Sequence, residues 1–160
     1  MSRLANLDVA YIPTPKKIVR QMLSLSKLRS GELLYDLGAG DGRILIEAAR
    51  GFGARCVGVE IDPERIARLK ERLASTRVEA EIVERDLMEV DLSTADVVAI
   101  YLSDSVNMKL APKLERELKN GARVVSLDYA LPGWNDDRRI TISSAGMKRV
   151  IYLYSKQART

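Results

Sequence analysis

A short glycine-rich stretch and the acidic side chains around it are the first candidates for chemistry. In LLYDLGAGDG, Asp36 ends an apolar run, and the loop Gly38, Ala39, Gly40, Asp41 and Gly42 follows at once. Polar side chains also follow three later apolar runs: Glu60, Asp86, and Tyr101 with Asp104. Such a spacing places acids and a tyrosine at the ends of successive buried segments, where an α/β sheet binds its ligands.

The spacing of the glycines distinguishes among several known nucleotide-binding motifs. A bare backbone lets a ligand approach closely, and the loop amides can point at it. Here the spacing is G-x-G-x-G, and Arg43 stands where the third glycine of a dinucleotide fingerprint would fit. No Gly-Lys-Ser/Thr phosphate motif occurs in the chain. The sequence therefore argues against a phosphate cradle.

Asp36 favours a cationic ligand, because a carboxylate would repel a pyrophosphate. S-adenosylmethionine carries a sulfonium and an ammonium and no phosphate, so we expect it here, with its ammonium near Asp36. An acid at the position of Glu60 can accept both ribose hydroxyls. Asp86 is placed to accept from the adenine amino group, and Ile61 with Leu87 to sandwich the ring.

Two simpler interpretations stay open at this stage. Asp62, just before Pro63, is better explained as a helix N-cap than as a ligand contact. Asp86 could equally cap the turn that follows it. Glu60 would suit NAD as well as adenosylmethionine, so it supports adenosine more than methionine.

Alternating apolar runs predict the elements that position these residues. Strands are expected over 33–38, 55–61, 80–86, 96–102 and 123–129. Helices are expected over 14–28, with Thr14 as N-cap, 43–50, from Asp62, and 103–120, where Pro112 would kink or restart the helix. A hairpin is expected over 138–155, around Ala145-Gly146. This order predicts an α/β fold, a mostly parallel sheet with helices on both faces and one antiparallel strand from the hairpin.

The whole chain has 160 residues, which suggests one domain: an arm and helix over 1–30 and a cofactor-binding core over 31–160. It has no histidine and a single cysteine, Cys56, which excludes a Cys/His metal site and a histidine triad. Cys56 is expected to be a buried small hydrophobe rather than a reactive thiol. Without a signal-like or membrane-spanning run, we expect a cytoplasmic protein. The few Asn and Gln residues favour a thermophile.

A family resemblance appears in DLGAGDGRILIEAA, GVEIDP, RDLMEVDLSTADVVAIYL and KLERELKNGARVVSLDYALPGW. These segments resemble small archaeal protein-lysine methyltransferases, above all the broad-specificity enzymes of crenarchaea. They also resemble mitochondrial relatives that modify the ATP synthase c-subunit and adenine nucleotide translocase. The resemblance implies a seven-stranded, Rossmann-like methyltransferase fold. It also implies that an N-terminal arm closes the cofactor site, with Tyr11, Pro13 and Thr14 lining it. A proline-fixed turn and a helix cap explain Pro13 and Thr14 equally well.

The segment Tyr101-Leu102-Ser103-Asp104 is where related enzymes place their acceptor chemistry. It lacks the Asn/Asp-Pro-Pro-aromatic motif of base-amine and glutamine methyltransferases and has no cysteine. We expect Tyr101 and Leu102 to contact the cofactor and Tyr101 to line a lysine channel. Asp104 would hold the incoming ammonium or take its proton. Alternatively, Tyr101 only packs at a strand end, and Asp104 or Ser103 is a helix N-cap.

The predicted substrate rim comprises Ser103, Asp128 and Trp134, although Trp134 is better explained as a cap over the core. We expect a monomeric protein-lysine N-methyltransferase of broad specificity that acts on exposed lysines, chromatin proteins included, without needing nucleic acid. The net charge of +4 permits a nucleic-acid partner but forms no basic block along the sequence. An RNA or DNA methyltransferase and a non-catalytic adenosylmethionine-binding module remain alternatives.

Overall fold

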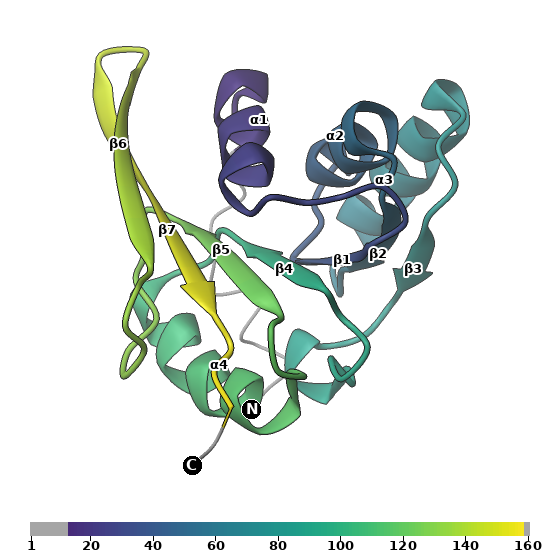
Figure 1. The fold of residues 1–160 in the computed structure, drawn as a ribbon. Helices are drawn as coiled ribbons and strands as arrows, with labels where there is room; N and C mark the ends of the chain where they lie inside the picture. The colour runs from purple at the N-terminus through teal and green to yellow at the C-terminus, as the bar shows by residue number, and fades with distance from the viewer. Residues whose placement is uncertain (1–12, 159–160) are drawn as a thin grey trace.

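The computed structural model describes residues 13–158, which form a seven-stranded sheet between two layers of helices (Figure 1). The strands lie in the order β3-β2-β1-β4-β5-β7-β6. Their bounds are β1 Leu33–Leu37, β2 Arg55–Val59, β3 Glu81–Val83, β4 Val97–Ile100, β5 Arg123–Leu127, β6 Arg138–Ser144 and β7 Met147–Ser155. The helices are α1 Lys16–Leu25, α2 Arg43–Phe52, α3 Pro63–Thr76, α4 Asp104–Glu117 and the 3-10 helix η2 Leu87–Glu89.

The sheet reverses its winding direction at β1, and this reversal locates the candidate site. The first five strands are parallel, and β1 pairs with β2 on one side and with β4 on the other. Ligands of open α/β sheets bind beyond the carboxyl ends of the strands at such a switch point. Strand β7 is antiparallel to both β5 and β6, so the predicted antiparallel insertion is confirmed.

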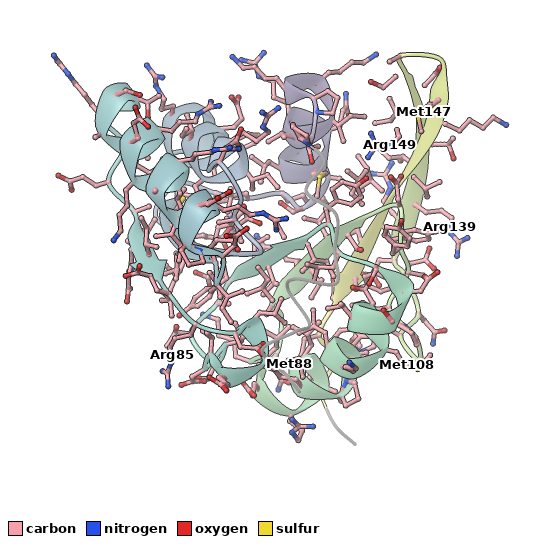
Figure 2. The ribbon with its side chains drawn as sticks, turned by 180° about the vertical axis from the view of Figure 1, so that it is seen from behind. Arg85, Met88, Met108, Arg139, Met147 and Arg149 are labelled. Atoms are coloured by element: carbon pink, nitrogen blue, oxygen red, sulfur yellow. The ribbon has the colours of Figure 1, made fainter. Side chains whose placement is uncertain are left out.

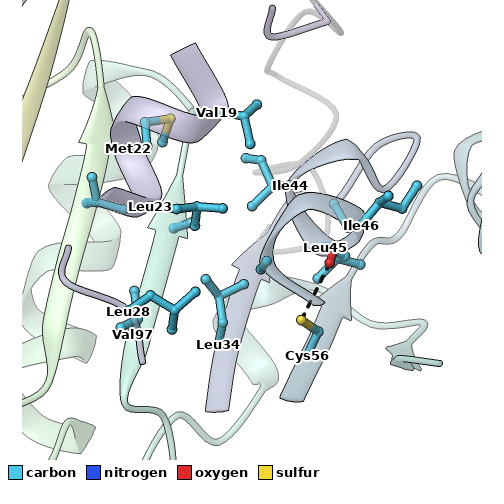
Figure 3. Packing of buried hydrophobic residues seen from close by; sticks show 14 of the residues in the cluster. Val19, Met22, Leu23, Leu28, Leu34, Ile44, Leu45, Ile46, Cys56 and Val97 are labelled. Carbon is cyan, nitrogen blue, oxygen red and sulfur yellow. Dashed lines mark hydrogen bonds between the residues drawn. The ribbon is translucent and has the colours of Figure 1, made fainter. Parts of the chain in front are cut away.

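The core has two halves, one on each face of the sheet. Helices α1, α2 and α3 cover one face, where Leu23, Leu34 and Leu45 pack with less than 2% of their surface exposed (Figure 3). Helix α4 covers the other face through Leu110 and Leu114. Strands buried on both faces are continuously apolar, as in the VVAI of β4, and this makes them legible in the sequence.

Cys56 lies inside the first of these halves. It is 5% exposed, and its thiol faces the Leu45 carbonyl of α2 at 3.6 Å (Figure 3). Burial, and then the charge of Asp36, raise the pKa of the Cys56 thiol to about 12. This is the inert, packed cysteine that the sequence predicts.

Helix ends are where the structure departs most from expectation. The N-cap of α1 is Pro15 rather than Thr14, and no side chain caps this helix. Asp62 does cap α3, accepting from the amide of Glu64, as predicted. Pro112 lies inside α4 without ending it. The carbonyl that loses its partner to Pro112 belongs to Met108, an exposed residue, so water can satisfy it.

The hairpin turns through Ala145 and Gly146, both with positive φ, the geometry that suits a tight two-residue connection. Across residues 13–158 there is no helix of the length and apolarity needed to cross a bilayer.

Candidate active site at the carboxyl edge of the sheet

The glycine loop is fixed against the end of β2 by backbone hydrogen bonds. The amides of Gly38 and Ala39 both donate to the carbonyl of Val59, at 2.8 and 2.9 Å. Gly38 and Gly42 have φ of 88° and 84°, in the left-handed region that favours glycine. A Cβ on Gly42 would lie 2.5 Å from the Leu69 Cδ1 of α3. Helix packing and backbone conformation therefore require Gly42, independently of any ligand.

Glu60 holds the loop in place. Only 1% of its surface is exposed, and its Oε1 accepts from the amide of Gly40 at 2.9 Å. Its Oε2 accepts from the amides of Ile61 and Asp62 at 2.9 and 3.1 Å. A carboxylate offers about four acceptor positions, so roughly one remains for a ligand hydroxyl. The ribose contact remains a prediction, while the bond to the glycine loop was not anticipated.

Asp36 ends up where the sequence predicted, in β1 directly before the loop, and is 3% exposed. Burial in the first place, and then the negative charges of Glu60 and Asp41, raise the pKa of the Asp36 carboxyl well above its usual range. No side chain or amide of the described residues donates a hydrogen bond to it. Such a carboxylate is stabilised by a cation, which fits the expected ammonium group.

Asp41 is engaged in ion pairs within the protein, and a cofactor contact of this loop residue stays a prediction. Its carboxylate pairs with Arg43 at 2.7 Å and with Arg72 of α3 at 3.1 Å. Burial alone would raise the pKa of Asp41, but the hydrogen bonds and charges of these two arginines hold it below its usual range. Asp41 thus links the start of α2 to α3, and the structure leaves its side chain no free charge for the cofactor.

Asp86 caps the turn that follows it, and its adenine contact stays a prediction. Its Oδ1 accepts from the amide of Met88 and caps η2, while its Oδ2 is buried without any hydrogen-bond partner. A free buried acceptor suits the adenine amino group. Leu87, in contrast, is completely buried in the core, and its predicted contact with the adenine ring stays a prediction. Ile61 remains partly exposed.

Tyr101, at the end of β4, lies among charged and aromatic groups. Its ring stacks on Tyr129 with centroids 6.3 Å apart, and the guanidinium carbon of Arg149 lies 5.4 Å from its centre. Burial is the main reason that the pKa of the Tyr101 hydroxyl is raised; the charge of Arg149 opposes it and that of Asp128 adds to it. The hydroxyl therefore stays protonated at neutral pH.

Arg149 is the residue that sequence reasoning missed. It comes from β7, is 9% exposed, and lies between the hairpin and α1 (Figure 2). Asp128 holds it, with Oδ2 accepting from Nε at 2.8 Å, while Oδ1 accepts from the amide of Val150. Asp128 itself has a φ of 65°, unusual for a residue other than glycine. Both oxygens of this predicted rim acid are thus engaged.

Ser103 and Asp104, which follow β4, have different roles. Ser103 is the N-cap of α4, with its Oγ accepting from the amide of Val106 at 3.2 Å. Asp104 is the exposed first residue of that helix, so its carboxylate is left free for another role. Leu102 is buried over Gly38, where its Cδ2 lies 3.3 Å from the position of a Cβ. The loops after β1 and β4 therefore pack together.

Trp134 packs on the α4 face of the sheet. Its indole nitrogen donates to the carbonyl of Ala111, and its ring meets the edge of Tyr154 at 6.2 Å. These contacts are those of a cap over the core. Its place on the substrate rim stays a prediction.

The start of the described chain lies beside the loop. Thr14 is 5% exposed, and its carbonyl accepts from Nη1 of Arg43 at 2.9 Å. Pro13 is exposed, and Tyr11 lies outside the described residues. Thr14 therefore lies next to the start of α2, and the cofactor-closing role of the arm stays a prediction.

Three buried polar atoms have no hydrogen-bond partner within residues 13–158: Asp86 Oδ2, Asn107 Oδ1 and Arg149 Nη2. Asp86 follows β3, Asn107 lies in α4 just after β4, and Arg149 reaches over the end of β4. Unpaired buried polar groups are rare, and here they gather at the carboxyl edge of the sheet. This is the arrangement of a ligand site. The described residues offer no group of three or more metal-ligating side chains.

Comparison with known proteins places this site in a family. The model of the ANTKMT methyltransferase domain matches residues 36–138, from Asp36 through the hairpin start. The chain belongs to the ANTKMT methyltransferase family. A protein-lysine N-methyltransferase of Saccharolobus islandicus is 45% identical over 91% of this chain and 92% of its own length. The resemblance inferred from the sequence is confirmed.

A second relative and one solved structure extend the comparison, and the structure names the cofactor product. The mouse adenine nucleotide translocase lysine N-methyltransferase is 36% identical over 90% of this chain, which spans 62% of that relative. A crystal structure of an RNA methyltransferase from Salinibacter ruber, solved with S-adenosyl-L-homocysteine, has 41% identity and a TM-score of 0.86. It covers 93% of this chain and 96% of its own. This ANTKMT-family chain is therefore an S-adenosylmethionine-dependent methyltransferase.

The residues of this methyltransferase fit its cofactor. Asp36 supplies a buried negative charge for an ammonium, and Asp86 Oδ2 a buried acceptor for an amino group. Glu60 orders the glycine loop and keeps roughly one acceptor position for a ribose hydroxyl.

Proposed function

We propose that this methyltransferase modifies the side-chain amine of lysines in proteins. The observation that carries the proposal is the environment of Tyr101, a protonated phenol at the end of β4 with a buried guanidinium beside its ring. The names of the archaeal and mouse relatives, both lysine N-methyltransferases, support it.

The acceptor must be neutral to attack. A lysine amine has a pKa of about 10.4 in water, so at pH 7 only about one in a few thousand is uncharged. The positive charge of Arg149 near Tyr101 disfavours the ammonium, and so does loss of water on entering the site. The Tyr101 oxygen can accept an N–H of the amine and leave its lone pair directed at the methyl group.

The cofactor supplies an activated methyl group on a sulfonium, and the leaving thioether is neutral. The work left for the chain is alignment, which can contribute about 7–11 kcal/mol. Asp36 would hold the amino-acid end of the cofactor, Asp86 its adenine, and the exposed Asp104 would attract the incoming ammonium or take its proton. No histidine is needed for these steps.

We extend the proposal to broad specificity, with exposed lysines of chromatin proteins among the targets, in a cytoplasmic monomer. Its support is the family resemblance of the segments around the site. A lysine side chain reaches beyond the surface of its own protein, so an exposed rim would accept many partners.

A second candidate function is RNA methylation, favoured by the similarity to the Salinibacter protein, which is named as an RNA methyltransferase. Against it, the stretch Tyr101 to Asp104 has none of the prolines typical of base-amine enzymes. Tyr101 and Tyr129 already stack on each other, so that pair offers a base little free ring surface.

Intact-mass spectrometry after incubation with S-adenosylmethionine tests the proposal. The acceptors are a lysine-rich chromatin protein, the same protein with its lysines blocked, and a structured RNA. We expect increments of one methylene on the unblocked protein alone, and Tyr101→Phe should lose most turnover while binding cofactor normally. Increments on the RNA alone would refute the lysine proposal and support the second candidate.

A further inference from the structure

A groove in the helical layer has no role in the chemistry above. It has a volume of about 570 Å³, and its lining comes from α1, α2 and α3. Its lining residues are Lys16, Val19, Arg20, Arg43, Ile46, Glu47, Arg50, Gly51, Arg72 and Thr76.

The groove concentrates positive charge. Its lining holds five basic side chains and one carboxylate, an excess of four, which equals the net charge of the entire chain. The positive and negative side chains of the rest of the sequence are therefore equal in number. The basic residues are far apart in the chain, and only the packing of three helices brings them together, so no basic block is visible in the sequence.

The carboxylates near the groove do not cancel this charge. Glu47 is already paired with Arg20 at 2.8 Å. Asp41 is shared by Arg43 and Arg72. Lys16 and Arg50 are exposed, and neither forms an ion pair with any residue in 13–158.

The polar chemistry of the lining is almost entirely that of donors. Guanidinium and ammonium groups only donate hydrogen bonds. The side-chain acceptors of the lining are Thr76 and Glu47, and Oε1 of Glu47 already accepts from Arg20. An acidic peptide would bring backbone N–H groups that need acceptors. A phosphodiester backbone brings acceptors alone, and four of the five cations are arginines, whose planar fork matches phosphate.

We propose that this groove binds the phosphate backbone of nucleic acid. No aromatic side chain lines it, so bases have no surface to stack on and binding is independent of sequence. If the proposed lysine methylation holds, the groove would bring the enzyme to proteins that are themselves bound to nucleic acid. A positively charged enzyme would then reach positively charged substrates through the polyanion between them.

Fluorescence anisotropy with a labelled DNA duplex of arbitrary sequence, and with an RNA duplex of the same sequence, tests the proposal. The variant carries Lys16→Glu and Arg50→Glu, which break no ion pair with a described residue. Its control is Lys109→Glu, an exposed cation of α4 on the other face of the sheet. Methylation of a short free lysine peptide is measured on each preparation, since it needs the active site and not the groove.

We expect micromolar binding at low salt, with a slope of about −3 in log affinity against log salt, as for three or four phosphates neutralised. The groove variant should lose at least about tenfold in affinity, the control less than about twofold, and peptide methylation should not change. Equal losses in variant and control, or tighter binding of polyglutamate than of either duplex, would overturn the proposal. Failure of the peptide assay in the unmodified protein would instead count against lysine methylation.

Discussion

Asp36 is held where its own charge is unfavourable. It is buried at the end of β1, beside the carboxylates of Glu60 and Asp41, and its pKa is raised accordingly. A folded-state pKa above the unfolded value of about 3.9 stabilises the fold at low pH. That contribution is lost as the pH rises through the raised pKa, so at neutral pH the free protein bears a cost that the cofactor's ammonium can relieve.

Removing the charge of Asp36 should change the stability of the fold and the affinity for the cofactor in opposite directions. We expect Asp36→Asn to melt higher than the unmodified protein at pH 7. The advantage should shrink towards pH 4, where the carboxyl is protonated in the folded state and about half protonated in the unfolded state. Its affinity for S-adenosylmethionine should fall by about tenfold or more, since a buried charged partner is lost. Thermal melts from pH 4 to 8 and calorimetric titrations measure the two effects.

Asp91→Asn is the matched control, because Asp91 is exposed and its pKa is lowered by hydrogen bonds from Ser93. A gain in stability at pH 7 with undiminished cofactor affinity would show that Asp36 does not contact the ligand.

In the proposed lysine chemistry, Arg149 acts on the acceptor through its charge. Removing it in Arg149→Met should shift the acid limb of the pH–rate profile for a lysine peptide upward by about one unit, because a nearby cation no longer disfavours the ammonium. Arg149→Lys keeps the charge and should restore the limb to within a few tenths of a unit. A purely structural role would lower the rate of both variants without moving the limb.

Sequence alone located the acids of the site and missed the guanidinium. Asp36, Glu60 and Asp86 follow consecutive parallel strands, whose carboxyl ends must meet at one edge. Arg149 reaches that edge from an antiparallel strand late in the chain, and nothing in KRVIYLYS marks it. The fate of Leu87 was also invisible, because periodicity does not tell which side of a strand end faces the core.

At the scale of elements, the glycine loop connects α2 to α3 through packing and ion pairs. Gly42 ends the loop with a left-handed backbone and leaves room for Leu69 of α3, while Asp41 draws Arg43 and Arg72 together. The order of strands and helices was predictable because the buried strands are mostly apolar, as in the VVAI of β4. Thr14 was mistaken for a cap because the residue type fits, although the chain enters α1 through Pro15.

The packing of the glycine loop against α3 can be tested with two glycines of the same backbone conformation. Gly42→Ala should destabilise the fold by about 2–4 kcal/mol, from left-handed strain and from a clash at 2.5 Å with Leu69. Gly121→Ala has a φ of 86° but no atom within 4 Å, so it should cost only about 1–2 kcal/mol. Urea unfolding of both variants measures the difference. Equal costs would mean that α3 moves away freely.

For the whole molecule, the parallel sheet with its switch point explains why one small chain can hold a cofactor without a second subdomain among the described residues. The antiparallel β7 pairs with β5 and brings Arg149 to the ring of Tyr101. The parallel sheet could be predicted from the alternation of strands and helices in the sequence. The basic groove could not be predicted, since it depends on how three helices pack.

Ligand binding should therefore stabilise the molecule as a unit. At about one hundred times its Kd, S-adenosylhomocysteine should add about 2.7 kcal/mol and raise the melting temperature by about 5–10 °C. NAD at the same concentration should leave it unchanged, because Asp36 opposes a pyrophosphate. Differential scanning fluorimetry compares them, and an equal shift with NAD would contradict the assignment of Asp36.

The single thiol of Cys56 also provides a built-in probe of local opening of the sheet. With a pKa of about 12, only about one in 10⁵ of these thiols is ionised at pH 7, and the side chain lies between β2 and α2. A maleimide can therefore react only when that part of the sheet opens. The rate of its labelling counts those openings, without any engineered probe, beside the strand that leads into the cofactor site.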